Sequence, residues 1–282
     1  MTDLNSPLKG KTALVTGGGG GLGRAFCVEL ARQGARVAVL SRRKESAEKG
    51  VKGVLDAGGE ALALTADVTD TSEVERARDE LESVWGPVHV LVNAAGGHQI
   101  GAVTALTHWD ASPPPTSGPA TFFDLDDGAL RAVSDLNFMG TVIPTRIFGR
   151  SMAAAGGGTV VNISSMSADR PMTKGMGYAA AKASVDNFTR WLAVHLAPAN
   201  IRVNAIAPGF FLTDQNRPLL IAEDGGWTDR ANRILDHIPL GRLGEPEELN
   251  GALAWLVNEE AARYVTGTVV CVDGGFSAYK GV

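Results

Sequence analysis

Tyr178 and Lys182 are the residues whose types and spacing most directly suggest chemistry. They lie four residues apart in a segment with helical spacing of apolar residues, so both side chains project from one face of a helix about one turn apart. An ammonium beside a phenol stabilises the phenolate and lowers a pKa that is ordinarily about 10. We therefore expect Tyr178 to donate or accept a proton near neutral pH, with Lys182 lowering its pKa.

Two further polar residues could share this site. Ser165 follows the apolar run 159–163 and precedes Tyr178 by thirteen residues, which would let its hydroxyl reach the carbonyl oxygen that Tyr178 protonates. Asn137 interrupts a mostly apolar helical stretch; it is either a site residue or an asparagine that is solvated or bonded to its own backbone. The candidate catalytic residues are Asn137, Ser165, Tyr178 and Lys182.

A glycine-rich run, residues 16–23, follows the first apolar run and opens the first helical segment. In this context glycines let a diphosphate approach backbone N–H groups and the positive end of a helix. The alternative is a tight turn that needs glycine only for its conformation. We expect the loop to bind a dinucleotide through Gly17, Gly19, Gly20, Gly21, Leu22 and Gly23.

The residues after the second apolar run indicate which dinucleotide binds. Dinucleotide folds commonly place Asp or Glu here, where it binds the adenosine ribose and repels a 2′-phosphate. This chain has Ser41, Arg42 and Arg43 instead, and guanidinium groups pair well with phosphate oxygens. NADP(H) is therefore favoured over NAD(H), unless the arginines form only a solvated charge cluster with Lys44 and Glu45.

The next two apolar runs also end in candidate cofactor contacts. Asp67 follows the third run and could accept a hydrogen bond from the adenine amino group, or cap a helix. Asn93, Ala94 and Gly96 follow the fourth run, where small residues would let the backbone approach a flat cofactor.

The elements that must position these residues alternate along the chain. Seven apolar runs look like buried strands, at residues 12–16, 36–40, 61–65, 88–92, 159–163, 201–206 and 268–272. Stretches with helical spacing separate them, which predicts a parallel sheet covered on both faces. We expect a single-domain, doubly wound α/β (Rossmann) fold over residues 1–282, with a seven-stranded parallel sheet flanked by helices and a ligand crevice at the carboxyl ends of the strands.

Two long segments break this alternation. Residues 97–123, here called the insertion, follow the fourth run, and residues 210–239, here called the lid, follow the sixth. Connections of this length within a domain are usually functional or mobile. We interpret the two segments as walls of a substrate pocket, with plain surface loops as the alternative.

The composition limits the partners and the compartment. The 282 residues include 26 basic and 31 acidic side chains, a formal net charge of −5, so nucleic acid is not an expected partner. No apolar run approaches the roughly 18 residues of a membrane span, and residues 1–7 have no basic start or apolar stretch for export. The two cysteines, Cys27 and Cys271, lie far apart in sequence and form no disulfide framework, which suits a reducing compartment. We expect a cytoplasmic protein that acts on a small molecule and holds no metal.

In their order and intervals these motifs resemble the short-chain dehydrogenases/reductases, in their single-domain form, over almost the whole chain. The motifs that carry the resemblance are residues 16–23, Asp67 with Val68, residues 93–96, Asn137, Ser165, Tyr178 with Lys182, Pro208 with Gly209, and Thr213.

The resemblance implies a role for each candidate. Tyr178 would be the proton donor and acceptor, Lys182 would lower its pKa and hold the nicotinamide ribose, and Ser165 would orient the substrate oxygen. Asn137 would hold a water in a proton relay behind Lys182, and Thr213 would contact the nicotinamide carboxamide. The family also suggests a homotetramer. Further cofactor contacts are implied at Val68, Pro208, Gly209 and Phe211.

Within that family the chain is similar to the bacterial D-mannonate oxidoreductases, also called fructuronate reductases, in residues 120–125, 135–141, 211–217 and 272–278. This similarity implies reduction of a ketone on a sugar acid, whose carboxylate would be held by Arg217 or Lys174, unless these are exposed charges without a contact. Two alternatives use the same machinery, a 3-oxoacyl reductase and a polyol or sugar dehydrogenase. A more remote alternative is a cofactor-sensing module without turnover.

Overall fold

Seven short apolar segments form the strands of one parallel sheet, and the computed structural model describes residues 6–112, 116–214 and 216–281. The strands are β1 (Thr12–Thr16), β2 (Arg36–Ser41), β3 (Glu60–Thr65), β4 (Val90–Asn93), β5 (Gly158–Ile163), β6 (Ile201–Pro208) and β7 (Val269–Val272). Their order is β3-β2-β1-β4-β5-β6-β7, so the winding reverses between β1 and β4, where such sheets bind ligands. The predicted doubly wound fold is confirmed, and the bounds of each strand lie within about two residues of the predicted ones.

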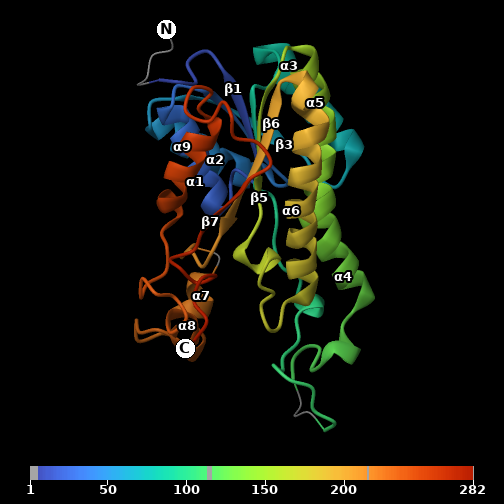
Figure 1. Cartoon of the computed structure of the whole chain (residues 1–282), viewed down its shortest axis with the longest axis vertical. Helices are drawn as coiled ribbons and strands as arrows, with labels where there is room; N and C mark the ends of the chain where they lie inside the picture. The colour runs from blue at the N-terminus through green and yellow to red at the C-terminus, as the bar shows by residue number, and fades with distance from the viewer. Residues whose placement is uncertain (1–5, 113–115, 215, 282) are drawn as a thin grey trace.

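Helices cover both faces of this sheet (Figure 1). One layer consists of α1 (Gly21–Arg32), α2 (Lys44–Asp56) and α9 (Asn250–Val257), and the other of α3 (Thr71–Trp85), α5 (Gly140–Ala154) and α6 (Met176–Leu196). Along β1, Ala13 and Val15 belong to the core under the first layer and Leu14 to the core under the second, because successive side chains of a strand point to opposite faces.

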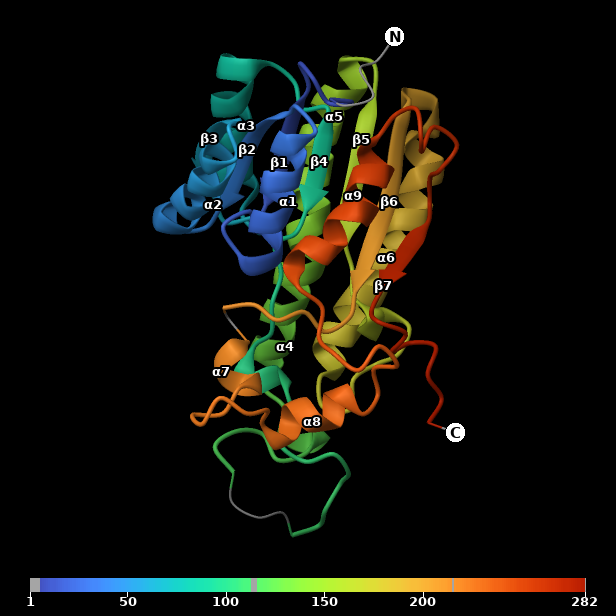
Figure 2. The ribbon, with the colours of Figure 1, turned by 90° about the vertical axis from the view of Figure 1, so that its left-hand side faces the viewer.

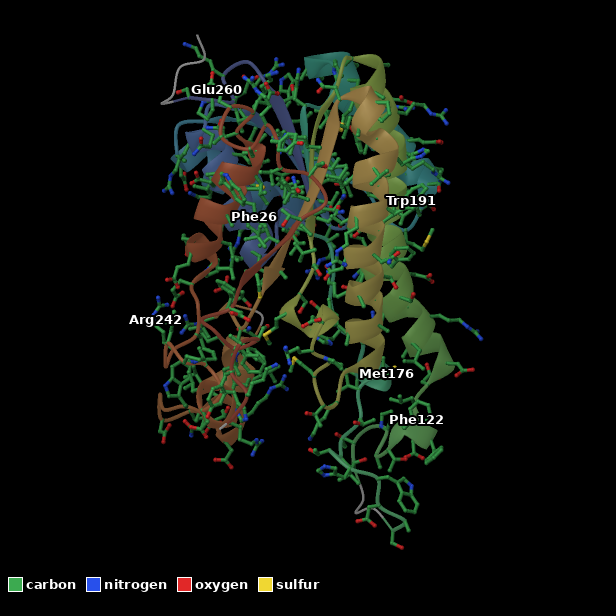
Figure 3. The ribbon with its side chains drawn as sticks, viewed as in Figure 1. Phe26, Phe122, Met176, Trp191, Arg242 and Glu260 are labelled. Carbon is green, nitrogen blue, oxygen red and sulfur yellow. The ribbon has the colours of Figure 1, made fainter. Side chains whose placement is uncertain are left out.

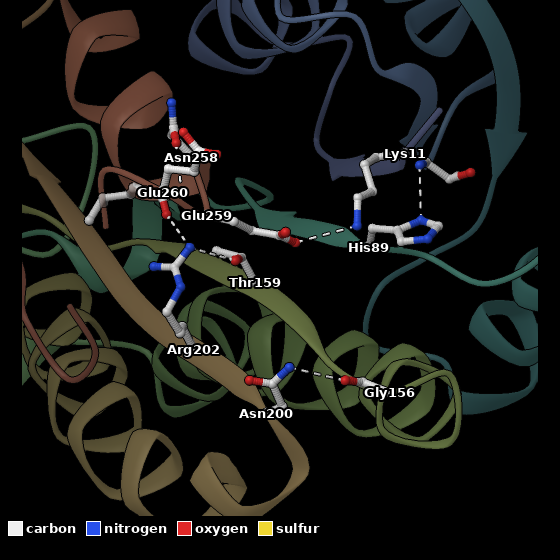
Figure 4. A network of polar contacts seen from close by, with 11 residues as sticks. Lys11, His89, Gly156, Thr159, Asn200, Arg202, Asn258, Glu259 and Glu260 are labelled. Atoms are coloured by element: carbon white, nitrogen blue, oxygen red, sulfur yellow. Dashed lines mark hydrogen bonds and ion pairs between the residues drawn. The ribbon is translucent and has the colours of Figure 1, made fainter. Parts of the chain in front are cut away.

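A network of polar contacts ties the amino ends of the strands together (Figure 4). The Arg202 guanidinium donates to Thr159 Oγ1 at 2.8 Å and to the carbonyl oxygen of Leu256 at 2.8 Å, which connects β6 to β5 and α9. Lys11 pairs with Glu259 at 3.4 Å in the same region. These side chains are engaged in holding the sheet together, so this edge has a structural role.

The insertion and the lid both project beyond the carboxyl ends of the strands (Figure 2). The insertion contains two short 3-10 helices, Ile100–Ala102 and Phe122–Asp124, and leads into α4 (Asp127–Ser134). The lid contains α7 (Arg217–Leu220) and α8 (Asp229–Leu235), which share a small apolar cluster of Leu220, Ala231, Ile238 and Leu243. Residues 113–115 of the insertion and 215 of the lid lie outside the described residues, as do residues 1–5, which were part of the expectation about export.

Some kinds of site are not found in the described part of the chain. Across residues 6–112, 116–214 and 216–281 no helix has both the length and the apolar character to cross a membrane. Over the same residues no three His, Cys, Asp or Glu side chains gather as metal ligands. Cys27 and Cys271 are free thiols, the first buried and the second exposed.

Candidate active site

Tyr178 and Lys182 lie near the start of α6, whose first residue, Met176, marks its lower end in Figure 3. The Lys182 side chain is buried, and its Nζ donates to the carbonyl oxygen of Ile163, the last residue of β5, at 2.7 Å. The same Nζ lies 5.6 Å from the centroid of the Tyr178 ring. The helix therefore brings the two side chains together, as their spacing predicts.

The pKa values of this pair differ from the expectation. Burial raises the pKa of Tyr178 above its ordinary value, and a hydrogen bond with Ser165 opposes the rise without cancelling it. Burial also lowers the pKa of Lys182 to about 8, against the opposing effect of Asp186. The prediction of a lowered pKa for Tyr178 is therefore wrong for this site, because the phenolate would lose more by dehydration than it gains from its neighbours.

Ser165 lies just past the end of β5, where it caps a 3-10 turn of residues Met166–Ala168. Its Oγ accepts hydrogen bonds from the Ser167 N–H at 3.2 Å and the Ser167 hydroxyl at 2.8 Å. It also shares a hydrogen bond with Tyr178. The strand end and the helix thus bring two hydroxyl groups together, which a substrate carbonyl oxygen could contact at once.

Asn137 lies in a π-helical turn (Asp135–Met139) between α4 and α5 and is fully buried. Its Oδ1 accepts from the Gly97 N–H at 3.1 Å, and its Nδ2 donates to the carbonyl oxygens of Gly97 and Val133, both at 2.8 Å. A Cβ added at Gly96 would lie 2.7 Å from Asn137 Oδ1 and 3.3 Å from Lys182 Nζ, so Asn137 lies beside the lysine. Both hydrogens of its amide are engaged within the protein, and its role in a water relay stays a prediction.

The backbone of the glycine loop lies so close to neighbouring segments that side chains would not fit at several of its positions. A Cβ at Gly17 would lie 2.8 Å from the Ala95 backbone, and a Cβ at Gly19 would overlap the Ser46 carbonyl. Gly20 is the N-cap of α1, and no side chain caps this helix end. Its first N–H groups, on Gly21, Leu22 and Gly23, are therefore suited to an anion such as the diphosphate of a dinucleotide.

Beyond β2 the structure places the two arginines in solvent. Ser41 Oγ accepts a hydrogen bond from the Gly19 N–H at 3.1 Å and so fixes the glycine loop. The side chains of Arg42 and Arg43 are exposed, and neither guanidinium forms a hydrogen bond or ion pair within the described part of the chain. Lys44 pairs with Glu48 at 3.9 Å rather than with its neighbours.

The polar residues after β3 and β4 make local bonds. Asp67 Oδ1 accepts from the N–H and the hydroxyl of Thr69, at 2.9 and 2.6 Å, so one carboxylate oxygen stabilises a turn.

Asn93 donates to Thr145 Oγ1 at 2.8 Å and to Asn162 Oδ1 at 2.9 Å inside the core. Its Oδ1 is buried without a partner among the described residues. Any contact of the 93–96 segment with a cofactor would therefore come from its backbone and from Ala94 and Gly96. Val68 packs against α5, with its Cγ2 2.8 Å from a Cβ added at Gly140.

The end of β6 leads into the lid through closely packed residues. Pro208 is the last residue of β6. A Cβ added at Gly209 would lie 2.6 Å from Asp273 Cα, so only glycine fits there without a shift. Phe211 is buried, and its ring fills the space that a side chain at Gly244 would need.

The start of the lid lies on the glycine loop. A Cβ added at Gly21 would lie 2.8 Å from Thr213 Cβ. One residue further on, the Asp214 carboxylate meets the Arg24 guanidinium of α1 at 2.5 Å, and this pairing lowers the pKa of Asp214. The structure therefore brings Thr213 to the site of the predicted cofactor.

The two candidate partners of a substrate carboxylate have different surroundings. Lys174 Nζ donates to the Ala105 carbonyl oxygen at 2.6 Å, and its own carbonyl accepts from the Thr104 N–H at 3.1 Å. Lys174 therefore connects the segment before α6 to the insertion. Arg217, the first residue of α7, is exposed and acts electrostatically on Asp214.

Two residues of the site were missed by sequence reasoning. The His98 ring packs on the Tyr178 ring, with centroids 4.1 Å apart and planes 30° apart. Arg230 of α8 and Lys182 both act electrostatically on His98 and, with burial, lower its pKa. No local pattern relates His98 to Tyr178, since they are 80 residues apart; the only signal was that His98 closely follows a strand end.

Comparison with known proteins fits this geometry. Residues 11–224 match the family model described as short chain dehydrogenase. The chain is 45% identical to UxuB of Bacillus subtilis, an uncharacterised oxidoreductase, over the whole of both chains. It is 36% identical to galactitol 2-dehydrogenase (L-tagatose-forming) of Cereibacter sphaeroides, covering 96% of this chain and 97% of that one.

A solved structure is also similar. It is a Haemophilus influenzae protein, provisionally named a D-mannonate oxidoreductase and crystallised with bound NAD, with a TM-score of 0.91, 42% identity and 98% of each chain covered. The region matched by the family model includes every motif from the glycine loop to Thr213. The chain therefore belongs to the short chain dehydrogenase family and is an oxidoreductase that acts on CH–OH groups.

Proposed function

We propose that this enzyme interconverts a ketone and a secondary alcohol on a sugar acid of the D-fructuronate/D-mannonate type. The observation that carries the proposed chemistry is the contact between Ser165 and Tyr178 beside the buried Lys182. These groups lie at the carboxyl edge of the sheet, where the glycine loop also opens. A cofactor-sensing module would need the loop but not the hydroxyl pair, so we favour an enzyme.

The chain's own residues account for the proton. In the reducing direction the substrate oxygen would accept hydrogen bonds from Ser165 and Tyr178, and Tyr178 would transfer its proton to that oxygen. Its raised pKa keeps the phenol protonated and ready to donate. A bound nicotinamide supplies or accepts the hydride at the carbon. Lys182, fixed by the Ile163 carbonyl, has two further N–H donors for the nicotinamide ribose, and Asn137 would hold a water that returns the proton towards Lys182.

We propose NADP(H) as the favoured cofactor. The guanidinium groups of Arg42 and Arg43, exposed after β2, have no partner among the described residues, which leaves both open to a 2′-phosphate. NAD(H) is the alternative, and the NAD bound by the similar Haemophilus influenzae protein favours it. The rest of the proposed cofactor site is the glycine loop, Asp67, Val68, the 93–96 segment and the lid residues Pro208, Gly209, Phe211 and Thr213.

The substrate class rests on relatives and on the basic residues near the site. The names of two similar proteins refer to D-mannonate and to galactitol, so a polyol or sugar dehydrogenase is the main alternative and a 3-oxoacyl reductase a further one. Arg217 is our first candidate for the substrate carboxylate. Lys174 comes after it because its ammonium already binds the Ala105 carbonyl, and Arg230 is an additional candidate through its proximity to His98.

We also propose a homotetramer in the cytoplasm. The outer surface of α6 has a shallow apolar hollow lined by Phe138, Phe188 and Trp191, and the Trp191 side chain, labelled in Figure 3, is 58% exposed. Such a surface fits a second copy of the chain. Sedimentation analysis of the purified protein gives its mass directly.

Steady-state assays of the purified enzyme test the proposed function. Reduction of D-fructuronate and D-tagaturonate would be compared with oxidation of free polyols and reduction of 3-oxoacyl thioesters, each with NADPH and NADH. The highest kcat/KM is expected for a sugar acid with NADPH. A higher kcat/KM for a polyol or a thioester would replace the sugar acid by that alternative, and no turnover of any compound would favour the sensing module.

A further inference from the structure

His98, a residue of the insertion, packs against the catalytic tyrosine, Tyr178. Its ring packs on the Tyr178 ring at 4.1 Å, and its Cε1 lies 3.8 Å from a Cβ added at Gly175, the N-cap of α6. The preceding residue, Gly97, is held at both its N–H and its carbonyl by Asn137. The imidazole is thus fixed in place by a rigid backbone and by the ring that it contacts.

Two other histidines of the chain use a ring nitrogen to contact a backbone group. His89 Nδ1 accepts from the Thr12 N–H at 3.1 Å, and His237 Nδ1 lies 2.8 Å from the Arg233 carbonyl oxygen. Within residues 6–112, 116–214 and 216–281, neither nitrogen of His98 has such a partner, and its side chain is accessible. The lowered pKa of His98 leaves the imidazole neutral at pH 7, with one donor and one acceptor nitrogen.

The surroundings show which space these nitrogens face. Arg230 of the lid acts electrostatically on the imidazole, so α8 lies near the ring that packs on Tyr178. A substrate whose oxygen is bonded to the Tyr178 hydroxyl would have the carbons next to its reacting carbon beside the phenol, on which the His98 ring packs.

We propose that His98 is a substrate-binding residue that hydrogen-bonds the hydroxyl on the carbon next to the reacting carbon, and so selects vicinal diols and α-hydroxy ketones. This proposal deepens the proposed function, because it requires the reacting oxygen to lie at Ser165 and Tyr178. It does not require the substrate to be an acid. A site that is built to hydrogen-bond a substrate hydroxyl rejects an analogue without it, because its own polar group is then left unpaired.

Two alcohols that differ by this one hydroxyl test the proposal. Oxidation of trans-cyclohexane-1,2-diol and of cyclohexanol would be measured with the wild type, His98→Phe and His98→Gln. Phe keeps the aromatic packing on Tyr178 and removes both nitrogens, whereas Gln keeps a donor and an acceptor. The wild type should show a kcat/KM for the diol at least about tenfold above that for cyclohexanol. In His98→Phe this ratio should fall towards one, because kcat/KM for the diol falls while that for cyclohexanol does not. In His98→Gln more of the ratio should be kept.

Several outcomes would overturn the assignment. A wild-type ratio near one would do so, as would failure of the wild type to oxidise the diol, or an unchanged ratio in His98→Phe. Equal losses for both alcohols in His98→Phe would mean that His98 only supports the Tyr178 ring. Thermal unfolding and cofactor titration show whether a variant is misfolded. If His98→Phe is misfolded, the ratio of kcat/KM for the diol to that for cyclohexanol in His98→Gln decides. Failure of the sugar-acid function is distinguishable, since D-fructuronate would then not be reduced while the diol preference and its dependence on His98 persist.

Discussion

Asn137 holds both main-chain groups of Gly97, accepting from its N–H at 3.1 Å and donating to its carbonyl at 2.8 Å. This pair of bonds joins the π-helical turn between α4 and α5 to the first residue of the insertion. A third hydrogen bond joins the Asn137 side chain to the Val133 carbonyl. The Asn137 side chain therefore fixes the backbone that leads from β4 to His98.

We expect Asn137→Ala to affect both stability and turnover. The change removes the three hydrogen bonds to the backbone groups of Gly97 and Val133, so the free energy of unfolding should fall by about 1–3 kcal/mol, and kcat should fall because the insertion is no longer fixed beside Tyr178. Urea denaturation and steady-state kinetics measure the two effects. Asn250→Ala is the matched control, since Asn250 is also a buried asparagine but its Oδ1 has no partner among the described residues. An equal loss in both variants would show that the bonds to Gly97 contribute nothing particular.

Replacement of Tyr178 by phenylalanine tests the proton donor. Tyr178→Phe removes the hydroxyl that contacts Ser165 and keeps the ring that packs on His98. Turnover should fall by roughly 100-fold or more while cofactor affinity is retained. Tyr264→Phe, at a fully exposed tyrosine, is the control and should be neutral. Retention of more than about a tenth of wild-type turnover would reject the role of Tyr178.

The buried lysine gives a prediction about stability and pH. Burial lowers the pKa of Lys182 from 10.5 to about 8, so between these values the unfolded chain binds a proton that the folded protein does not. The free energy of unfolding should therefore rise with pH through this window. Lys182→Met should remove this contribution and be more stable at pH 7, by on the order of 3 kcal/mol, while losing turnover.

Denaturation at several pH values between about 7 and 10 measures the difference between the wild type and Lys182→Met. Lys52→Met, at a lysine whose side chain is 74% exposed, controls for the loss of a positive charge. If the wild type and Lys182→Met changed in parallel across the window, the lowered pKa of Lys182 would be refuted.

Local patterns predicted the fold and part of the site well. The strands of a parallel sheet are covered on both faces, so most of their side chains are apolar, as at Ala13, Leu14 and Val15 of β1, and the runs can be recognised without knowledge of the tertiary structure. Tyr178 and Lys182 belong to one helix and Ser165 to the strand end before it, so their proximity also follows from short-range geometry. These predictions depend only on residues close in sequence.

Features that depend on packing between distant segments could not be predicted. The direction of the Tyr178 pKa shift depends on how deeply its phenol is buried and on what surrounds it, and spacing along α6 contains no information on that. Lys174 was a candidate partner for the substrate carboxylate on sequence grounds, whereas in the structure a carbonyl of the insertion accepts a hydrogen bond from its ammonium. Arg230 reaches His98 only because the lid and the insertion fold towards the same edge of the sheet.

The two arginines after β2 should decide the cofactor preference. If Arg42 or Arg43 pairs with a 2′-phosphate, replacing both with alanine should weaken NADPH binding by about 2–4 kcal/mol and leave NADH binding nearly unchanged. Fluorescence titration with both cofactors measures this directly. Lys44→Ala, which removes a neighbouring charge that pairs with Glu48, is the control. A wild-type preference for NADH, or equal losses for both cofactors, would show that the arginines form only a solvated surface.

The last prediction concerns the substrate carboxylate. Arg217 follows Thr213 by four residues, and its N–H donates to the Thr213 carbonyl at 2.9 Å. Thr213 in turn lies on the glycine loop, so a guanidinium at Arg217 starts close to the predicted nicotinamide. Guanidinium binds a carboxylate in a two-point geometry that an ammonium cannot reproduce. We therefore expect Arg217→Lys to lose part of kcat/KM for a sugar acid and Arg217→Ala to lose more, by about 2 kcal/mol if the pair is shielded from water.

The neutral sugar analogue separates binding of the acid from support of the lid. Both Arg217 variants should leave its kcat/KM nearly unchanged, because it has no carboxylate to lose. Arg263→Ala, at an exposed arginine just after α9, controls for net charge. If the acid and the neutral analogue lost activity equally, Arg217 would be supporting the lid, and the carboxylate partner would be sought first at Lys174 and then at Arg230. The true partner would be identified by a loss of kcat/KM for the acid alone in Lys174→Gln or in Arg230→Gln, whereas a loss for both substrates in Lys174→Gln would mean that this lysine only connects the insertion to the segment before α6.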